Sequence, residues 1–245
     1  MGSHVQMPKG MIKRFGFKDD FTWCYSFDNK SISRPAARRL GSIDNFYSDT
    51  LEKEINQKIE TPFFQVTSRL YQTANPNCFQ GINTDDRQVI VQFYSSVFSR
   101  FQDLEELYNN AFVHTGSDHD KAFRFFSQKN LDAFFDQFFI TLYFNRAGIP
   151  FVLPQVGMTS FFCTKSNSLD LMMPVFPDIA ILFESPLDPA TYQPTVYETN
   201  QIDSIRHINK MLANTQRKIG GWVVCPDKNE LEQTISGYNS EAETK

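Results

Sequence analysis

The chain has 245 residues, which is enough for one large domain or two small ones with a substantial core. Aromatic residues are abundant, with 25 Phe and 9 Tyr, and charged residues make up 21% of the chain and are scattered along it. A disordered chain is poor in aromatic residues, so this composition argues against disorder. The mean hydropathy of −0.38 is typical of a soluble globular protein.

The cysteines and the apolar runs predict a cytoplasmic protein without a membrane partner. The four cysteines lie far apart and form no CxxC pair, which favours reduced thiols over a disulfide framework or a zinc site. The longest apolar run, AFFDQFFITLYF, is interrupted by Asp136 and Gln137. It is too short to span a bilayer.

The net charge of −4 is unevenly distributed along the chain. Up to Ile43 there are eight Lys and Arg against three Asp, a balance of +5, so the remainder carries −9. A basic end on an acidic body can mark an anionic partner, here nucleic acid or an acidic protein. The alternative is a solvated basic edge that pairs internally with the acidic remainder. The candidate nucleic-acid contacts are Lys13, Arg14, Arg34, Arg38 and Arg39.

Aromatic residues interleave with these basic residues. Phe15, Phe17, Trp23 and Tyr25 are therefore candidates for stacking on single-stranded nucleic acid. The alternative is core packing, because Trp23 and Tyr25 share one face of a predicted strand with Phe21 and Phe27.

The next hundred residues have mostly helical patterns. A helix should begin near Ser48 or Asp49, and Pro62 should break or kink it. Another helix should be capped by Thr84, with a buried face of Val89, Ile90, Phe93, Tyr94, Val97, Phe98 and Phe101. The strongest helical period predicts a central helix that Gly148 and Pro150 end; its apolar residues are Leu131, Phe134, Phe135, Phe138, Phe139, Leu142 and Tyr143.

From Pro150 the pattern changes to short apolar runs, which favour strands: FVLPQV, TSFFCT, LDLMMPVF and DIAILFES. A further helix is expected at 202–212, followed by a strand at WVVC. We therefore expect an α+β fold in which the helical N-terminal two-thirds packs on a small, mostly antiparallel sheet from the C-terminal third plus an N-terminal strand. We expect a single domain over 1–245, helix-rich at 48–147 and strand-rich at 150–226, with a partly flexible tail at 227–245.

Several motifs resemble a large, mostly bacterial family of uncharacterised proteins, the domain of unknown function four-two-three-eight. The opening HxxxPxxxLxxF of the family is matched by His4, Pro8, Ile12 and Phe15, and a later strand pair with two prolines by Pro174 and Pro177. The family's helix Arg is matched by Arg100 and the Asn of its closing helix by Asn209. The "FiTSDnPv" turn of the family has no counterpart in FVLPQVGMTSFFCT. The resemblance implies a fold and a bacterial relative of unassigned activity.

A second functional hypothesis is a divalent-metal-dependent nuclease. Pro177-Asp178, followed by Glu198-x-Asn200, loosely resembles the PD-(D/E)xK pattern, with Asn200 in place of the lysine. Asp178 opens one apolar strand and Glu198 closes another, so both can lie at one sheet edge and hold Mg²⁺ or Mn²⁺, with His4 as a further catalytic candidate. The structural alternatives are a turn at Asp178 and a helix cap at Asn200.

A second cluster of possible metal ligands is HTGSDHD, with His114, Asp118, His119 and Asp120. In a polar loop between helices such a cluster is more often solvent-facing turn chemistry. No glycine-rich phosphate loop, GxSxG, CxxC or Cys-His pair at recognisable spacing is present, which argues against nucleophilic catalysis and familiar nucleotide-binding loops.

Overall fold

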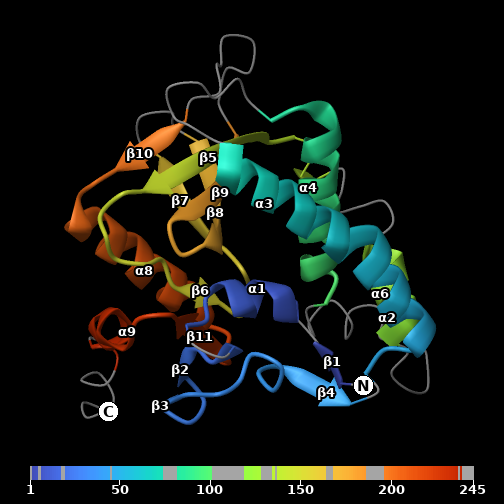
Figure 1. Cartoon of the computed structure of the whole chain (residues 1–245), viewed down its shortest axis with the longest axis horizontal. Helices are drawn as coiled ribbons and strands as arrows, with labels where there is room; N and C mark the ends of the chain where they lie inside the picture. Colours follow the sequence, from blue (N-terminus) through green and yellow to red (C-terminus); the bar gives the residue numbers. More distant parts are fainter. Residues whose placement is uncertain are drawn as a thin grey trace. The chain divides into compact units, whose positions relative to one another are not determined.

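The chain is an α+β protein that divides into two compact units (Figure 1). Unit 1 comprises Met1–Pro8 and Gly41–Ile140, and unit 2 comprises Lys9–Leu40 and Thr141–Lys245. The computed structural model describes residues 2–4, 7–17, 20–44, 46–73, 82–100, 119–127, 134–135, 137–163, 168–185, 196–236 and 238. Two compact units can belong to one domain, so the expected single domain stays a prediction.

Unit 1 is mainly helical. Its helices are α2 (Asp49–Ile55), the π-helix η2 (Asn56–Glu60), α3 (Thr61–Thr73), α4 (Thr84–Phe98) and α6 (His119–Ser127), and strand β1 (Gly2–His4) pairs with β4 (Ser42–Asp44). Ser48 caps α2 as predicted, because its hydroxyl accepts a hydrogen bond from Leu51 N at 3.2 Å. The cap of α4 is Asn83 and not Thr84; its side-chain oxygen accepts from Asp86 N at 2.8 Å.

Pro62 is accommodated by a widened turn, and the helix continues through it to Thr73. Proline has no N–H to donate to the carbonyl four residues before it. In η2 the backbone bonds run five residues back, as from Thr61 N to Asn56 O. The predicted break is therefore replaced by a π-helical segment.

The core of unit 1 joins α3 to α4. The rings of Phe63 and Phe93 stack with centroids 3.5 Å apart, and Tyr94 packs edge-on against Phe63 at 5.8 Å. Beside them Arg100, whose side chain is 2% exposed, forms an ion pair with Glu60 at 2.8 Å. The π-helix thus supplies the carboxylate that balances a buried guanidinium.

The described residues of unit 2 form two sheets and three helices. One sheet has the order β10-β5-β9-β8-β7 and the other β3-β2-β11-β6. The strands are β2 (Trp23–Ser26), β3 (Ser31–Ser33), β5 (Phe139–Asn145), β6 (Leu153–Pro154), β7 (Thr159–Cys163), β8 (Ser168–Phe176), β9 (Ile179–Glu184), β10 (Tyr197–Thr199) and β11 (Trp222–Cys225). The helices are α1 (Lys9–Arg14), α8 (Ile202–Arg217) and α9 (Lys228–Ile235).

These strands correct the expected layout in two places. Strands occur from residue 23 onward, so the N-terminal two-thirds is not a helical layer on a C-terminal sheet. Residues 139–145, predicted as the end of the central helix, form strand β5, and most of that strand is buried. A continuous apolar run that is buried on both faces has the same pattern in a strand as in a buried helix, so periodicity alone cannot distinguish them.

Helix α8 is attached to unit 2 by buried amide side chains. Asn209, which is 0% exposed, accepts a hydrogen bond from Val152 N at 3.0 Å and donates one to Pro150 O at 2.9 Å. The helix is preceded by Gln201 as its N-cap residue, so Asn200 is not the cap. Helix α9 occupies part of the tail expected to be flexible, and Asp227 caps it by accepting from Asn229 N at 2.7 Å.

Candidate functional site

The two units differ in charge. Unit 1 carries 8 Lys and Arg against 14 Asp and Glu, a net of −6, and unit 2 carries 16 against 14, a net of +2. The excess in unit 2 comes from residues 9–40, where eight basic residues face three acidic ones. The basic segment is therefore part of unit 2. Whether it can bind an anion depends on how exposed its basic side chains are and on whether they already have partners.

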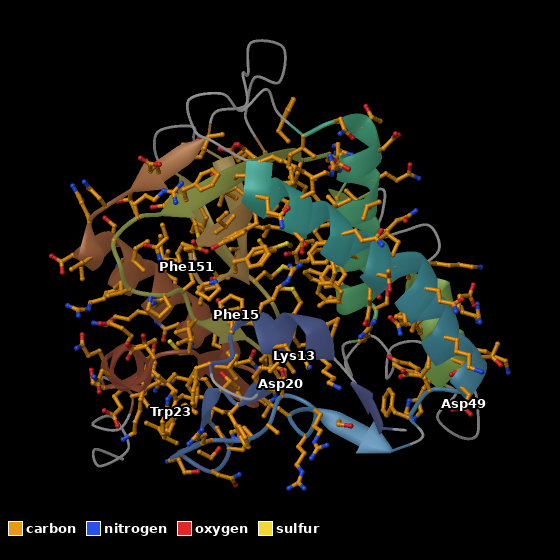
Figure 2. All side chains as sticks on the ribbon, viewed as in Figure 1. Lys13, Phe15, Asp20, Trp23, Asp49 and Phe151 are labelled. Atoms are coloured by element: carbon orange, nitrogen blue, oxygen red, sulfur yellow. The ribbon has the colours of Figure 1, made fainter. Side chains whose placement is uncertain are left out.

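Two of the five basic residues singled out by sequence have partners within unit 2. Lys13 forms an ion pair with Asp20 at 2.6 Å, and Figure 2 shows both side chains beside α1. The guanidinium of Arg14 lies 4.1 Å from the ring centroid of Phe176 and donates to Val175 O at 3.5 Å. Arg14 is thus half-buried against β8, and its main contribution is to attach α1 to that strand.

Arg34 lies among aromatic rings. Its guanidinium is 4.7 Å from the ring centroid of Phe17 and 5.0 Å from that of Phe21. Phe17 in turn stacks with Trp23, with centroids 5.7 Å apart and planes inclined by 15°. All three rings are half-buried, and Arg34 is exposed.

A lysine from the far end of the chain completes this group. The ammonium of Lys228, the first residue of α9, lies 5.7 Å from the ring centroid of Trp23 and also pairs with Glu232 at 3.0 Å. Strand β11 brings it there, because Cys225 pairs with Trp23 in the sheet. We call this group the aromatic–cation surface; it consists of Phe17, Phe21, Trp23, Arg34 and Lys228.

Arg38 and Arg39 follow directly from this surface. Phe21 forms an antiparallel bridge with Ala36, and Ala37 N donates to Asp20 O at 2.9 Å, so residues 36–39 run beside Phe21. Both arginines are exposed, and no carboxylate in the described part of the chain pairs with them. Both are therefore available to an anion.

The aromatic residues proposed for stacking separate into two groups. Phe15 and Tyr25 are buried, 0% and 3% exposed, so their stacking role is replaced by core packing; Figure 2 shows Phe15 and Phe151 inside unit 2. Phe17 and Trp23 remain partly accessible.

Asp178 and Glu198 lie at the same end of the five-stranded sheet. Asn145 N donates to Asp178 O at 2.8 Å, and Thr199 lies opposite Asn145 in the parallel pair of β10 and β5. Strand β5 separates them, so two spacings between neighbouring strands, about 10 Å, divide their backbones. Glu198 is 49% exposed and pairs with Arg146 at 3.3 Å.

These carboxylates do not make a complete metal site. Among the residues whose placement is described, no group of three or more His, Cys, Asp or Glu side chains could hold a metal ion. The arginine beside Glu198 neutralises a charge that Mg²⁺ or Mn²⁺ would need. The described residues therefore offer a divalent ion no more than these two carboxylates, and one of them is paired with Arg146.

The remaining histidine candidates have backbone or packing contacts. His4 lies in β1, where its backbone pairs with Ser42. His114 and Asp118 lie outside the described residues. The ring of His119 stacks on Phe46 with centroids 3.8 Å apart, and Asp120 accepts a hydrogen bond from Ser48 N at 3.1 Å, which ties α6 to the start of α2.

Two of the four thiols, those of Cys24 and Cys225, are in an environment that makes them unreactive. Cys24 and Cys225 are free and buried, in neighbouring strands β2 and β11. Burial raises the pKa of each thiol to about 12. Neither thiol is therefore a nucleophile near neutral pH.

Comparison with known proteins adds no relative: no family model matches the chain, and neither a curated protein nor a solved structure is significantly similar to it. No helix in the described ranges is long and apolar enough to cross a membrane.

Proposed function

We propose that the protein is an accessory protein that binds nucleic acid through the aromatic–cation surface of unit 2 and the adjoining Arg38 and Arg39. The observation that carries this proposal is the exposed guanidinium of Arg34 beside the partly accessible rings of Phe17 and Phe21, with the exposed Arg38 and Arg39 following within five residues along the chain. Guanidinium groups bind phosphate oxygens with two parallel hydrogen bonds. The surface therefore offers both charge and geometry for a phosphate backbone.

Fold stability is a weak explanation for these cations. An exposed ion pair contributes only about 0–1 kcal/mol, and Arg38 and Arg39 do not form one with any described carboxylate. Several cations within a Debye length of about 8–10 Å act together on a polyanion. Such a cluster gains more from a ligand with regularly spaced charges than from internal pairing.

The rings favour nucleic acid over an acidic protein. Carboxylates need only cations, whereas bases also need flat apolar faces. Phe17, Phe21 and Trp23 supply such faces beside Arg34. The assignment to the uncharacterised bacterial family is part of the proposal and leaves the activity open. A cytoplasmic location is proposed as well, and the free thiols Cys24 and Cys225 support it.

Fluorescence anisotropy with labelled single-stranded and duplex oligonucleotides, in DNA and RNA form, tests the proposal between about 50 and 200 mM salt. We expect the affinity to fall linearly on a log–log plot against salt. Replacing Arg38 and Arg39 by Gln should reduce the slope by about 1.4 for a single strand and about 1.8 for a duplex.

The matched control removes two exposed positive charges, one from helix α8 and one from its C-cap residue, by Lys210→Gln with Lys218→Gln. This variant should leave affinity and slope unchanged. Equal losses in both double variants, or no binding to any oligonucleotide, would overturn the proposal. Binding to polyglutamate in place of the oligonucleotides would identify an acidic protein as the partner.

The alternative function is a degenerate PD-(D/E)xK nuclease, supported by the position of Asp178 and Glu198 at one sheet end. It is tested by incubating the same labelled strands with Mn²⁺ and following their length. Cleavage that is lost in both Asp178→Ala and Glu198→Ala would favour the enzyme. Intact strands under conditions of full binding would favour the accessory protein.

A further inference from the structure

We infer that the aromatic–cation surface prefers single-stranded nucleic acid, because Trp23 is placed to stack with an unpaired base. This inference rests on the proposed function and specifies its ligand. A duplex presents phosphates but keeps its bases stacked on one another, so only an unpaired strand can use both the cations and a ring. Two contacts of the Trp23 indole are important for this preference: the ring of Phe17, which holds the indole in place, and the ammonium of Lys228, which a base would have to displace.

The indole is fixed before any ligand binds. Trp23 belongs to β2, the strand between β3 and β11, and Cys225 is its partner in β11. Phe17 stacks with it at 5.7 Å and 15°. A ring held by a central strand and a stacked neighbour loses little conformational freedom when a base arrives.

The competing contact at the indole is weaker than base stacking. The ammonium of Lys228 lies 5.7 Å from the ring centroid, and its side chain is 47% exposed. An exposed cation–ring contact changes an equilibrium about 2- to 5-fold, whereas stacking of a base changes it about 5- to 150-fold. A base therefore displaces the ammonium from the ring.

The displaced lysine keeps a role in the complex. Lys228 has a flexible four-carbon side chain at the start of α9, and a phosphate next to the stacked base lies within its reach. Glu232, its present partner at 3.0 Å, is also on the surface, so breaking this ion pair costs little free energy. Removal of the charge by Lys228→Gln should reduce the salt slope for a single strand by about 0.7 without abolishing stacking.

The decisive test uses the unmodified protein and two strands of equal length, one of thymidines and one of abasic sugar-phosphates. We expect the thymidine strand to bind about 5- to 150-fold more tightly. We also expect it alone to quench tryptophan fluorescence, because Trp23 is partly accessible and Trp222 is buried. Equal affinity for the two strands, or an unchanged fluorescence at saturation, would overturn the inference.

Two variants of Trp23 add a check on the residue. Trp23→Leu should remove most of the difference between the two strands, and Trp23→Phe should retain it. If Trp23→Leu does not fold, the comparison of the two strands on the unmodified protein still decides the outcome. A Trp23→Leu protein that folds and retains the full difference would assign stacking to another ring and refute the inference.

The two proposals fail in different ways. Salt-sensitive binding that is weakened by Arg38→Gln with Arg39→Gln, but is equal for thymidine and abasic strands, retains the proposed function and refutes the single-strand inference. Stronger binding to duplex than to the thymidine strand has the same meaning. Absence of binding to all of these strands refutes both.

Discussion

Replacement of Asn209 by leucine should destabilise unit 2 much more than the same replacement five residues later in the same helix. Asn209 is completely buried and serves two backbone groups, the N–H of Val152 and the carbonyl of Pro150. Leucine has the same number of side-chain heavy atoms with the same branching but no polar atoms, so both groups lose their partner. Each buried group left without a partner costs about 1–3 kcal/mol.

The expected loss follows from these two groups. Their combined cost is about 2–6 kcal/mol, and burial of the added apolar surface offsets up to about 2 kcal/mol. Taking the middle of both ranges, about 4 less about 1, we expect the free energy of unfolding to fall by roughly 3 kcal/mol. The control, Asn214→Leu, lies on the exposed face of α8 and should change it by less than about 0.5 kcal/mol.

Urea unfolding followed by tryptophan fluorescence measures this difference. The chain has two tryptophans, Trp23 and Trp222, and both are in unit 2, so the signal reports the unit that contains the mutation. Equal slopes against urea in all proteins would show that the same surface is exposed on unfolding. A loss below about 1 kcal/mol for Asn209→Leu, or equal losses in the two variants, would refute the reasoning.

Three further predictions concern stability and thiol reactivity. Glu60→Ala removes the carboxylate that Glu60 places beside the buried guanidinium of Arg100 and should cost about 2–4 kcal/mol, less than for a fully buried pair because Glu60 is 19% exposed; unfolding followed by circular dichroism measures it, and an unchanged midpoint would contradict the role of the pair. Ser48→Ala removes the cap of α2 and should cost about 1 kcal/mol in the same assay, whereas no loss would exclude the cap. Burial raises the pKa of the Cys24 and Cys225 thiols to about 12. At about pH 8 both should therefore react with an aromatic disulfide at least about a hundredfold more slowly in the folded protein than in the unfolded protein. Equal reaction rates in the two states would refute their burial.

Local signals in the sequence predicted several elements because the deciding interaction lies within a few residues. The start of α2 was predicted at Ser48 or Asp49 from their place before an apolar stripe, and Ser48 is the cap; the short strands after Pro150 were predicted from their flanking turns. The position of Asp178 and Glu198 at one sheet end also followed from where each stands in its strand.

Other features depend on contacts that are distant in the chain. Residues 139–145 form a strand that is buried on both faces. Such a strand has a continuous apolar run with no two-residue alternation, so the hydrophobic pattern does not distinguish it from a buried helix. The ring of Trp23 meets Lys228 only because β11 pairs with β2. The contact of Arg14 with Phe176 likewise joins residues far apart in the chain, and the ion pair of Lys13 with Asp20 depends on how the chain folds after α1. The sequence alone therefore did not separate these two residues from the other basic residues.

The position of β11 between β2 and β6 has a consequence for biosynthesis. During translation the first strand of this sheet leaves the ribosome about 200 residues before the strand that must lie beside it. Unit 1 lies between them in the chain, so its helices can form while β2 still lacks that neighbour. A nascent chain that stops before Trp222 leaves β2 with an open hydrogen-bonding edge, and such edges are where partly synthesised chains associate.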